Sequence, residues 1–169
     1  ANVITAAMTQ ARAITANFAI DSHTLTVVSA YGGAQPGTTT TNWGTALSCY
    51  LTNSPVLAGP TQYVASGAVV TGNDAVPVNS TNTSLTLTNE ATLTWQWATN
   101  YWLDMTAGPN GSVDVADGWV AAGSNVAIAA TASNHWHFTG WSGDTQGCVS
   151  AANVITAAMT QARAITANF

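Results

Sequence analysis

Charged residues are scarce in this chain, and lysine is absent. Charged side chains make up only 5% of the 169 residues, against about a quarter in an average globular domain. The net charge is −5, and the only two positive side chains, Arg12 and Arg163, belong to one repeated segment. Nucleic acids and anionic membranes are bound through Lys/Arg patches, so this composition argues against both as partners.

Long apolar runs are also missing. No stretch approaches the ~20 apolar residues that a membrane-spanning helix needs, so we expect no membrane insertion. The chain is nevertheless not typical of a disordered protein, because 47% of it is apolar and it contains seven Trp. Thr, Ser, Asn and Gly supply the polarity in place of charge. Such a neutral, hydroxyl-rich surface favours a protein that lives in contact with copies of itself.

Catalytic motifs are absent as well. Ser and Thr are common, but no G-x-S-x-G or H-E-x-x-H sequence occurs. Glu90 and Asp104 lie near aromatic clusters, and we interpret them as solvated acids rather than as the paired carboxylates of a glycosidase. We predict that the protein is not an enzyme and uses no cofactor.

Metal-binding patterns are incomplete. His135 and His137, in "HWHF", are two residues apart on an expected strand and would face the same side around a buried Trp. A metal site needs further ligands, and the only other histidine is His23. Asp114 and Asp117 straddle a turn but lack the spacing of an EF-hand. We therefore predict no metal site.

One 18-residue segment, "ANVITAAMTQARAITANF", occurs twice, at 1–18 and at 152–169. Self-similarity at a fixed period is typical of repeat proteins, so we interpret this sequence as part of a tandem array with a period of 151 residues. Residues 1–18 would then be the end of the preceding unit. A single chain with duplicated ends, or an artefact, are the alternatives. Each copy is predicted to form a hairpin that turns at "TQA".

Apolar and polar residues alternate with a period of two through most of the chain, as in "SLTLT", "TLTWQW" and "NVAIA". Runs of Gly, Pro, Asn and Asp separate these stretches, and "GPNG" at 108–111 is the sharpest hairpin signal. The pattern predicts an all-β fold of two small antiparallel modules, sandwich-like or β-grasp-like. We place the first module at 19–100 and the second at 101–169, packed along a Trp-rich seam without a linker.

The second module contains a G-x-V step, a G-W step, a "V-x-I-x-A" strand, an "F-x-x-W-S-G-D" stretch and a terminal "ITANF". In these motifs it resembles the divergent InlB B-repeat family. The matching positions are Gly111, Val113, Gly118, Trp119, Gly123, Val126, Ile128, Ala130, Phe138, Trp141, Ser142, Gly143, Asp144, Ile165, Thr166, Ala167, Asn168 and Phe169. The first half, with "YGGAQPGT" and "LTWQW", resembles a companion module found beside this family in large bacterial surface proteins.

This resemblance implies a small, secreted β fold strung in tandem on bacterial cell-surface or adhesin-like proteins, with no catalytic residues. It also implies roles for four kinds of motif residue. Phe138 and Trp141 would belong to the core, Gly140 and Gly143 would set turns, and Asp144 would bond nearby backbone amides. The implied localisation is extracellular or at the bacterial cell surface.

Covalent modification is suggested at two kinds of residue. Cys49 and Cys148 are the only thiols, and in a secreted protein a bond between them would clamp the two modules, worth about 4 kcal/mol in the chain-entropy model. A bond between neighbouring chains and two free buried thiols are the rival possibilities. Asn79, Asn82 and Asn110 fit the N-glycosylation pattern, which in a bacterium mostly goes unmodified.

We therefore expect a structural repeat unit of an extracellular stalk or fibre. Its partners would be identical neighbouring units or protomers, and residues 1–18 would pack on the first module just as 152–169 would pack on the next unit. The alternative is an adhesin or carbohydrate-binding module that stacks glycans on exposed Trp, for which Trp43 is the best candidate. The residues expected to pack between units are Val3, Ile4, Met8, Ile14, Phe18, Ile155, Met159, Ile165 and Phe169.

Overall fold

The computed structural model describes residues 2–73 and 80–169, and these contain strands but no helix. The all-β prediction is confirmed. The strands are β1 (Ser22–Val28), β2 (Ala34–Gln35), β3 (Thr39–Asn42), β4 (Thr45–Leu51), β5 (Val56–Ala58), β6 (Thr61–Thr71), β7 (Asn82–Leu87), β8 (Ala91–Ala107), β9 (Gly111–Val113), β10 (Gly118–Ala121), β11 (Asn125–Ala132), β12 (Gly140–Gly143), β13 (Val149–Ala151), β14 (Val154–Ala158) and β15 (Arg163–Asn168).

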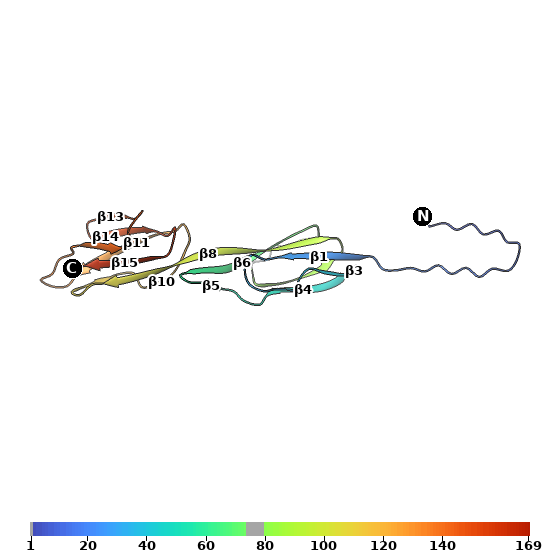
Figure 1. Cartoon of the computed structure of the whole chain (residues 1–169), viewed down its shortest axis with the longest axis horizontal. Coiled ribbons are helices and arrows are strands. Elements are labelled where there is room, and N and C mark those ends of the chain that lie inside the picture. The colour runs from blue at the N-terminus through green and yellow to red at the C-terminus, as the bar shows by residue number, and fades with distance from the viewer. Residues whose placement is uncertain (1, 74–79) are drawn as a thin grey trace.

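One strand, β8, runs the length of the elongated body and joins its two halves (Figure 1). At about 3.3 Å per residue its 17 residues span about 56 Å. Its first part pairs with β1 and β6, and its last part pairs with β10 and β15. Because a paired strand resists bending, this shared strand holds the two halves in line.

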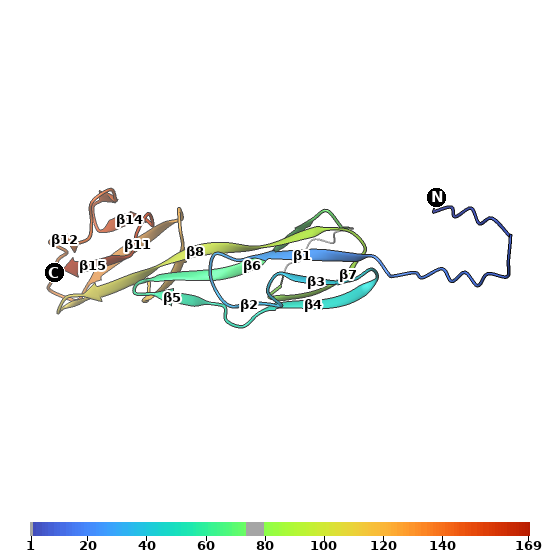
Figure 2. The same ribbon diagram turned by 45° about the vertical axis from the view of Figure 1, so that its right-hand side comes forward.

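The first half is a two-layer structure. Strands β1, β3, β5 and β6 form one layer with β8, while β2, β4 and β7 form a small sheet on the other side (Figure 2). Between the layers lies a core in which Leu25, Leu87 and Leu93 are fully buried. Trp95 is also buried, as its place beside Leu93 in the alternating pattern predicts.

The second half has its own two layers and its own core. Here β8 pairs with β10 and β15, β12 pairs with β15, and the facing sheet has the order β13-β14-β11-β9. Leu103, Ile128 and Ile165 are among the buried residues between them. Phe138 and Trp141, expected in the core, are half-buried at its edge with their ring centroids 5.3 Å apart.

Two pairings within this mostly antiparallel structure are parallel. Both β1 and β15 run parallel to β8. The chain therefore enters the first half at one end of the long axis and leaves the second half at the opposite end (Figure 1).

The hairpin predicted for each copy of the repeated segment is wrong. Residues 2–18 form no strand. The closing copy, 152–169, is not a hairpin either. Its two strands do form, but β14 lies between β13 and β11 in one sheet, whereas β15 lies between β12 and β8 in the other. Each strand therefore has both edges occupied by other partners. We call this arrangement the closing arch: two strands, β14 and β15, that face each other across the core instead of pairing.

The "HWHF" segment also differs from the prediction. It is a loop rather than a strand, His135 has a left-handed backbone conformation (φ 69°), and Trp136 is 53% exposed instead of buried. The two histidines therefore do not flank a core residue. The alternating pattern misled here because the loop is short and rich in aromatic side chains.

The disulfide between Cys49 and Cys148 is not formed. Cys49 is fully buried in the first core, while Cys148 packs against the second core, and both are free thiols. The reason is architectural: β4 carries Cys49 into the small sheet of the first half, and Cys148 precedes β13 in the second. Burial in apolar surroundings raises the pKa of the Cys49 thiol.

Candidate functional site

The repeated segment is present in two different states, and this difference is the most informative feature of the molecule. In the closing copy, 152–169, Ile165 is 1% exposed. In the leading copy, 1–18, the identical residue Ile14 is 55% exposed, and Phe18 is 94% exposed. The same sequence is thus buried in the core of a module in the closing copy and exposed to solvent in the leading copy.

The closing copy completes the second core. Alternate side chains of the arch point inward, and Ile155, Met159 and Ile165 are each no more than 1% exposed. Burial of a large aliphatic side chain is worth about 1.5–3 kcal/mol, so these three contribute a substantial share of a typical domain's stability. The second half is therefore incomplete without this segment.

A buried arginine holds the bend of the arch. Arg163 is 4% exposed, and its guanidinium donates to three backbone carbonyls. Its Nε bonds the Ala158 carbonyl (2.8 Å), and its Nη1 bonds the carbonyls of Asp144 (2.7 Å) and Gln146 (2.9 Å). The carbonyl dipoles replace the water that the cation has lost, and they tie the bend to the loop after β12.

The "SGD" motif also holds β15 in place. The Asp144 carboxylate accepts a hydrogen bond from the Ala164 amide (3.0 Å), and the Asp144 amide donates to the Ala164 carbonyl (2.8 Å). Gly143 has a φ of 90°, and a Cβ there would collide with that carbonyl. The expectation that Asp144 bonds nearby amides is thus met by an amide 20 residues away in the chain, on β15.

The last residue of the segment packs on a glycine. The ring of Phe169 lies so close to Gly111 that a Cβ at that position would overlap it. The ring also meets Phe138 edge-on at a centroid distance of 6.0 Å. The glycine of the G-x-V step and the phenylalanine of "ITANF" are therefore two parts of one contact.

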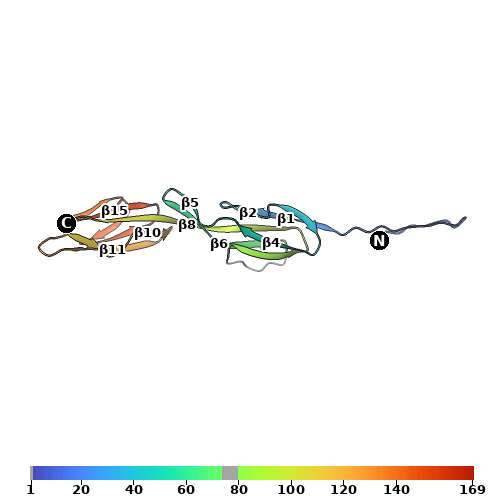
Figure 3. The ribbon, with the colours of Figure 1, turned by 90° about the horizontal axis from the view of Figure 1, so that it is seen from below.

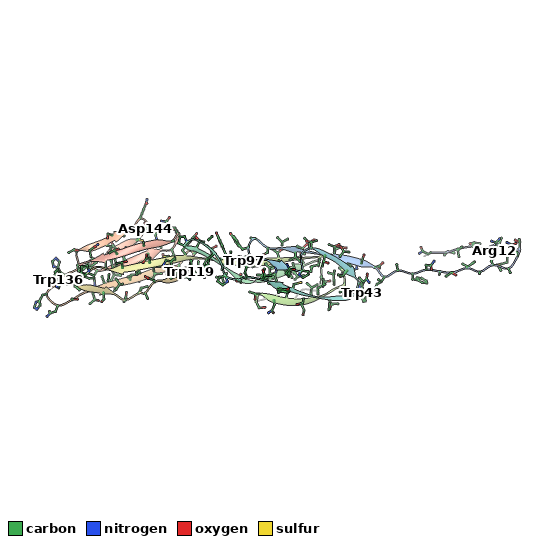
Figure 4. The ribbon with its side chains drawn as sticks, turned by 60° about the horizontal axis from the view of Figure 1, so that its bottom comes forward. Arg12, Trp43, Trp97, Trp119, Trp136 and Asp144 are labelled. Atoms are coloured by element: carbon green, nitrogen blue, oxygen red, sulfur yellow. The ribbon has the colours of Figure 1, made fainter. Side chains whose placement is uncertain are left out.

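The leading copy keeps part of this shape while it is exposed. Arg12 Nε donates to the Ala7 carbonyl (2.9 Å), which is the equivalent of the Arg163–Ala158 bond. Its two arms, 2–4 and 14–18, line a common hollow. The segment projects beyond β1 along the long axis, with Arg12 at its tip (Figures 3 and 4).

The expected packing of residues 1–18 on the first module is wrong. Among the described residues 2–18, every one is exposed except the half-buried Ala6. The core of the first half is already closed by the small sheet of β2, β4 and β7, so it offers no vacant place. The surface that fits this sequence lies in the second module, where the closing copy occupies it.

The residues expected to pack between units therefore divide into two groups. Those of the closing copy serve their own module: Ile155, Met159 and Ile165 are buried in it, and Phe169 is half-buried. Those of the leading copy remain uncovered: Val3, Ile4, Met8, Ile14 and Phe18 are all exposed large apolar side chains.

The candidate acids do not form a catalytic pair. Glu90 precedes β8 and Asp104 lies near its other end, so the strand separates them by about 46 Å, far beyond the ~10 Å limit for paired glycosidase carboxylates. Glu90 instead accepts a hydrogen bond from the Thr24 amide (2.9 Å) and lies 3.7 Å from His23. Asp114 and Asp117 accept bonds from backbone amides at 2.7 Å, which gives both a structural role.

The remaining candidate residues lie apart from one another. Trp43 is 55% exposed in the turn between β3 and β4. Asn82 is exposed at the start of β7, Asn110 is half-buried in a tight turn with a φ of 72°, and Asn79 lies outside the described residues. Within residues 2–73 and 80–169, no three His, Cys, Asp or Glu side chains gather as metal ligands would.

Two functional features escaped the sequence reasoning. The burial of Arg163 was missed, although a single cation in an otherwise uncharged segment is a signal that it has a specific place. The exposure of Trp136 was not predicted because the alternating pattern indicates a strand where the structure has a loop. Both lie in the second half, and Figure 4 shows Trp136 at the end opposite to Trp43.

Comparison with known proteins identifies the second half. Residues 101–169 match the family model of the divergent InlB B-repeat domain, which confirms the resemblance over that range. No curated protein and no solved structure matches the chain. The part of the chain that the structure describes has no helix long and apolar enough to cross a membrane.

Proposed function

Since residues 101–169 match the family model of the divergent InlB B-repeat domain, we propose that the chain is a repeat unit of a bacterial surface stalk or fibre that grows by head-to-tail addition of identical units. The family is one of tandem surface repeats, which supports the location and the repetition. The observation that most directly supports this proposal is the direction of the chain: β1, β8 and β15 all run in one direction along the long axis.

The joint between successive units follows from the repeat. Residue 169 of one unit corresponds to residue 18 of the next, so only Ala19 and Ile20 separate the closing Phe from Asp21. The Asp21 carbonyl accepts a hydrogen bond from the Trp43 amide (2.8 Å), which places the Trp43 turn beside the joint. Three residues reach at most about 11 Å, so a joint this short makes a stiff string.

Exposed aromatic side chains lie at both ends that would meet. Trp43 marks the end where the chain enters, and Trp136 marks the end where it leaves (Figure 4). Phe138, which contacts Phe169, belongs to the Trp136 loop. Contact between these ends would remove apolar surface from water and further stiffen the string.

A two-unit chain tests this function: residues 1–169 followed directly by 19–169. We expect small-angle X-ray scattering to show a rod about twice as long as the single unit. The matched control carries a long Gly-Ser insertion between Phe169 and Ala19, which should bend freely. A directly joined chain as flexible as this control would refute the stalk.

Glycan binding is the second candidate function, and the exposure of Trp43 favours it. Exposed aromatic faces stack on sugar rings. A glycan array probed with the single unit and with Trp43→Ala tests this candidate. Binding that disappears in the variant would support an adhesin, whereas no binding by the parent would remove it.

A further inference from the structure

We propose that residues 2–18 are an exchangeable strand donor: in a second copy of this chain they take the place of 153–169 and complete that copy's second module. The inference deepens the proposed function, and its biological sense rests on that function. Its physical basis is separate, because it depends only on the two copies of one segment.

The first argument is identity. Every inward-facing side chain of the closing arch has its equal in the leading copy, including Ile4 for Ile155 and Ile14 for Ile165. The site in the second module that accommodates 153–169 therefore accommodates 2–18 with the same contacts and hydrogen bonds. Residues 3–7 would lie between β11 and β13 of the second copy, and residues 12–17 would lie between β8 and β12.

The second argument is shape. A donor that is already bent loses less conformational freedom on binding than a random segment does. The leading copy retains the hydrogen bond from Arg12 to Ala7 across the bend, and its two arms face each other around a hollow. It thus presents an open form of the arch that it would build.

The third argument is the apolar surface. In the arm 14–18, apolar side chains alternate with polar ones, which is the pattern of a strand that buries one face against a core. Val3, Ile4, Met8, Ile14 and Phe18 are uncovered together on one short segment. Strand addition satisfies both the apolar side chains and the unpaired backbone groups of such a segment.

The free-energy change for exchange between full-length chains is close to zero. For every leading copy that enters a neighbour, a closing copy of equal sequence must leave. The contacts cancel, and the balance depends on protein concentration and on any contact formed at the joint. A change that weakens only the closing copy should therefore drive assembly, and because the donor and this site lie at opposite ends, the product is an open head-to-tail chain.

The test compares four versions of the full chain, namely the parent and three variants. The closing-copy variant carries Ile155→Asp and Ile165→Asp, the leading-copy variant carries the matched Ile4→Asp and Ile14→Asp, and the fourth version carries all four substitutions. We expect the closing-copy variant to form linear oligomers in light scattering after gel filtration. The leading-copy variant should stay monomeric with an intact second module, and the fourth version should stay monomeric with that module unfolded.

Trypsin gives an independent readout, because the chain has no lysine and only two arginines. In the parent chain, Arg12 is exposed and Arg163 is buried, so cleavage should release residues 1–12 and spare the rest. In the assembled closing-copy variant the pattern should reverse. Cleavage after Arg12 should slow roughly tenfold or more, while the displaced Arg163 becomes accessible.

The outcomes separate the two proposals. A closing-copy variant that remains monomeric and is still cut at Arg12 would overturn strand donation, as would equal assembly by the version with four substitutions. The directly joined two-unit chain could still form a rod in that case, so the repeat function would stand. A flexible two-unit chain together with a reversed trypsin pattern would leave strand donation and remove the stalk.

Discussion

Truncation of one isoleucine at two places in an identical sequence isolates the effect of tertiary structure. We compare Ile165→Ala, in the closing copy, with Ile14→Ala, in the leading copy. The other seventeen residues of the segment are the same in both cases. Local propensity and local hydrogen bonding therefore cancel, and any difference in stability reports the surroundings in three dimensions.

The structure predicts a large difference. Ile165 is 1% exposed within the second core, and removal of such a side chain to Ala costs about 2–5 kcal/mol, including the cavity that remains. Ile14 is 55% exposed on a segment that contacts neither core, and surface changes of this kind stay within about 0.5 kcal/mol. The first variant should therefore lose several times more stability than the second.

Urea unfolding followed by Trp fluorescence measures the difference. Trp119 and Trp141 report on the second half, where Trp141 packs against the core. With a slope of about 1–3 kcal/mol per molar urea, a loss of ~3 kcal/mol moves the midpoint down by about 1–3 M. The experiment is run at low protein concentration, so that exchange between chains does not contribute.

Two results would refute the reasoning. Equal destabilisation by both substitutions would mean that the leading copy is packed as well as the closing one. No destabilisation by Ile165→Ala would mean that the closing arch is not part of the second core. Either result would also remove the physical basis of strand donation.

Three further predictions concern other residues of the same framework. Arg163→Ala should cost about 2–5 kcal/mol of unfolding free energy because it leaves buried carbonyls without donors, whereas Arg12→Ala should change stability by less than about 0.5 kcal/mol in the same urea assay. Without reductant, the denatured chain should react with two equivalents of a thiol reagent, and the native chain should react at Cys148 well before Cys49. Because burial raises the pKa of Cys49, the free energy of unfolding should keep its full value below the ordinary thiol pKa and should fall as pH rises through the raised pKa. Cys49→Ala should remove that fall. Gly143→Ala should lower the thermal midpoint of the second half by several degrees, since a Cβ meets a backbone carbonyl there and the backbone has positive φ.

The alternation of side chains was enough to predict the all-β class and some of the strands, among them β7, β8 and β11. The pattern at Leu93 and Trp95 places both in the core, and both are buried. The glycines and aromatic residues of "SGD" and "ITANF" were enough to predict the family model that residues 101–169 match. These features are local, because each depends on residues a few positions apart.

The pairing of strands was not predictable in the same way. Two strands joined by the "TQA" bend look like a hairpin from their sequence, yet β14 and β15 belong to different sheets. What separates them is the presence of four other strands at their edges. Likewise, the free state of the two cysteines depends on which core each strand enters, and the sequence left this open.

The repeated segment marks the boundary between the two kinds of information. The eighteen residues by themselves determined the bend, since Arg12 and Arg163 each bond the carbonyl five residues earlier. They also determined which side chains alternate inward. Whether those side chains are buried was decided only by the tertiary structure, because burial requires apolar partners from β8 and β11, and only the closing copy lies against them.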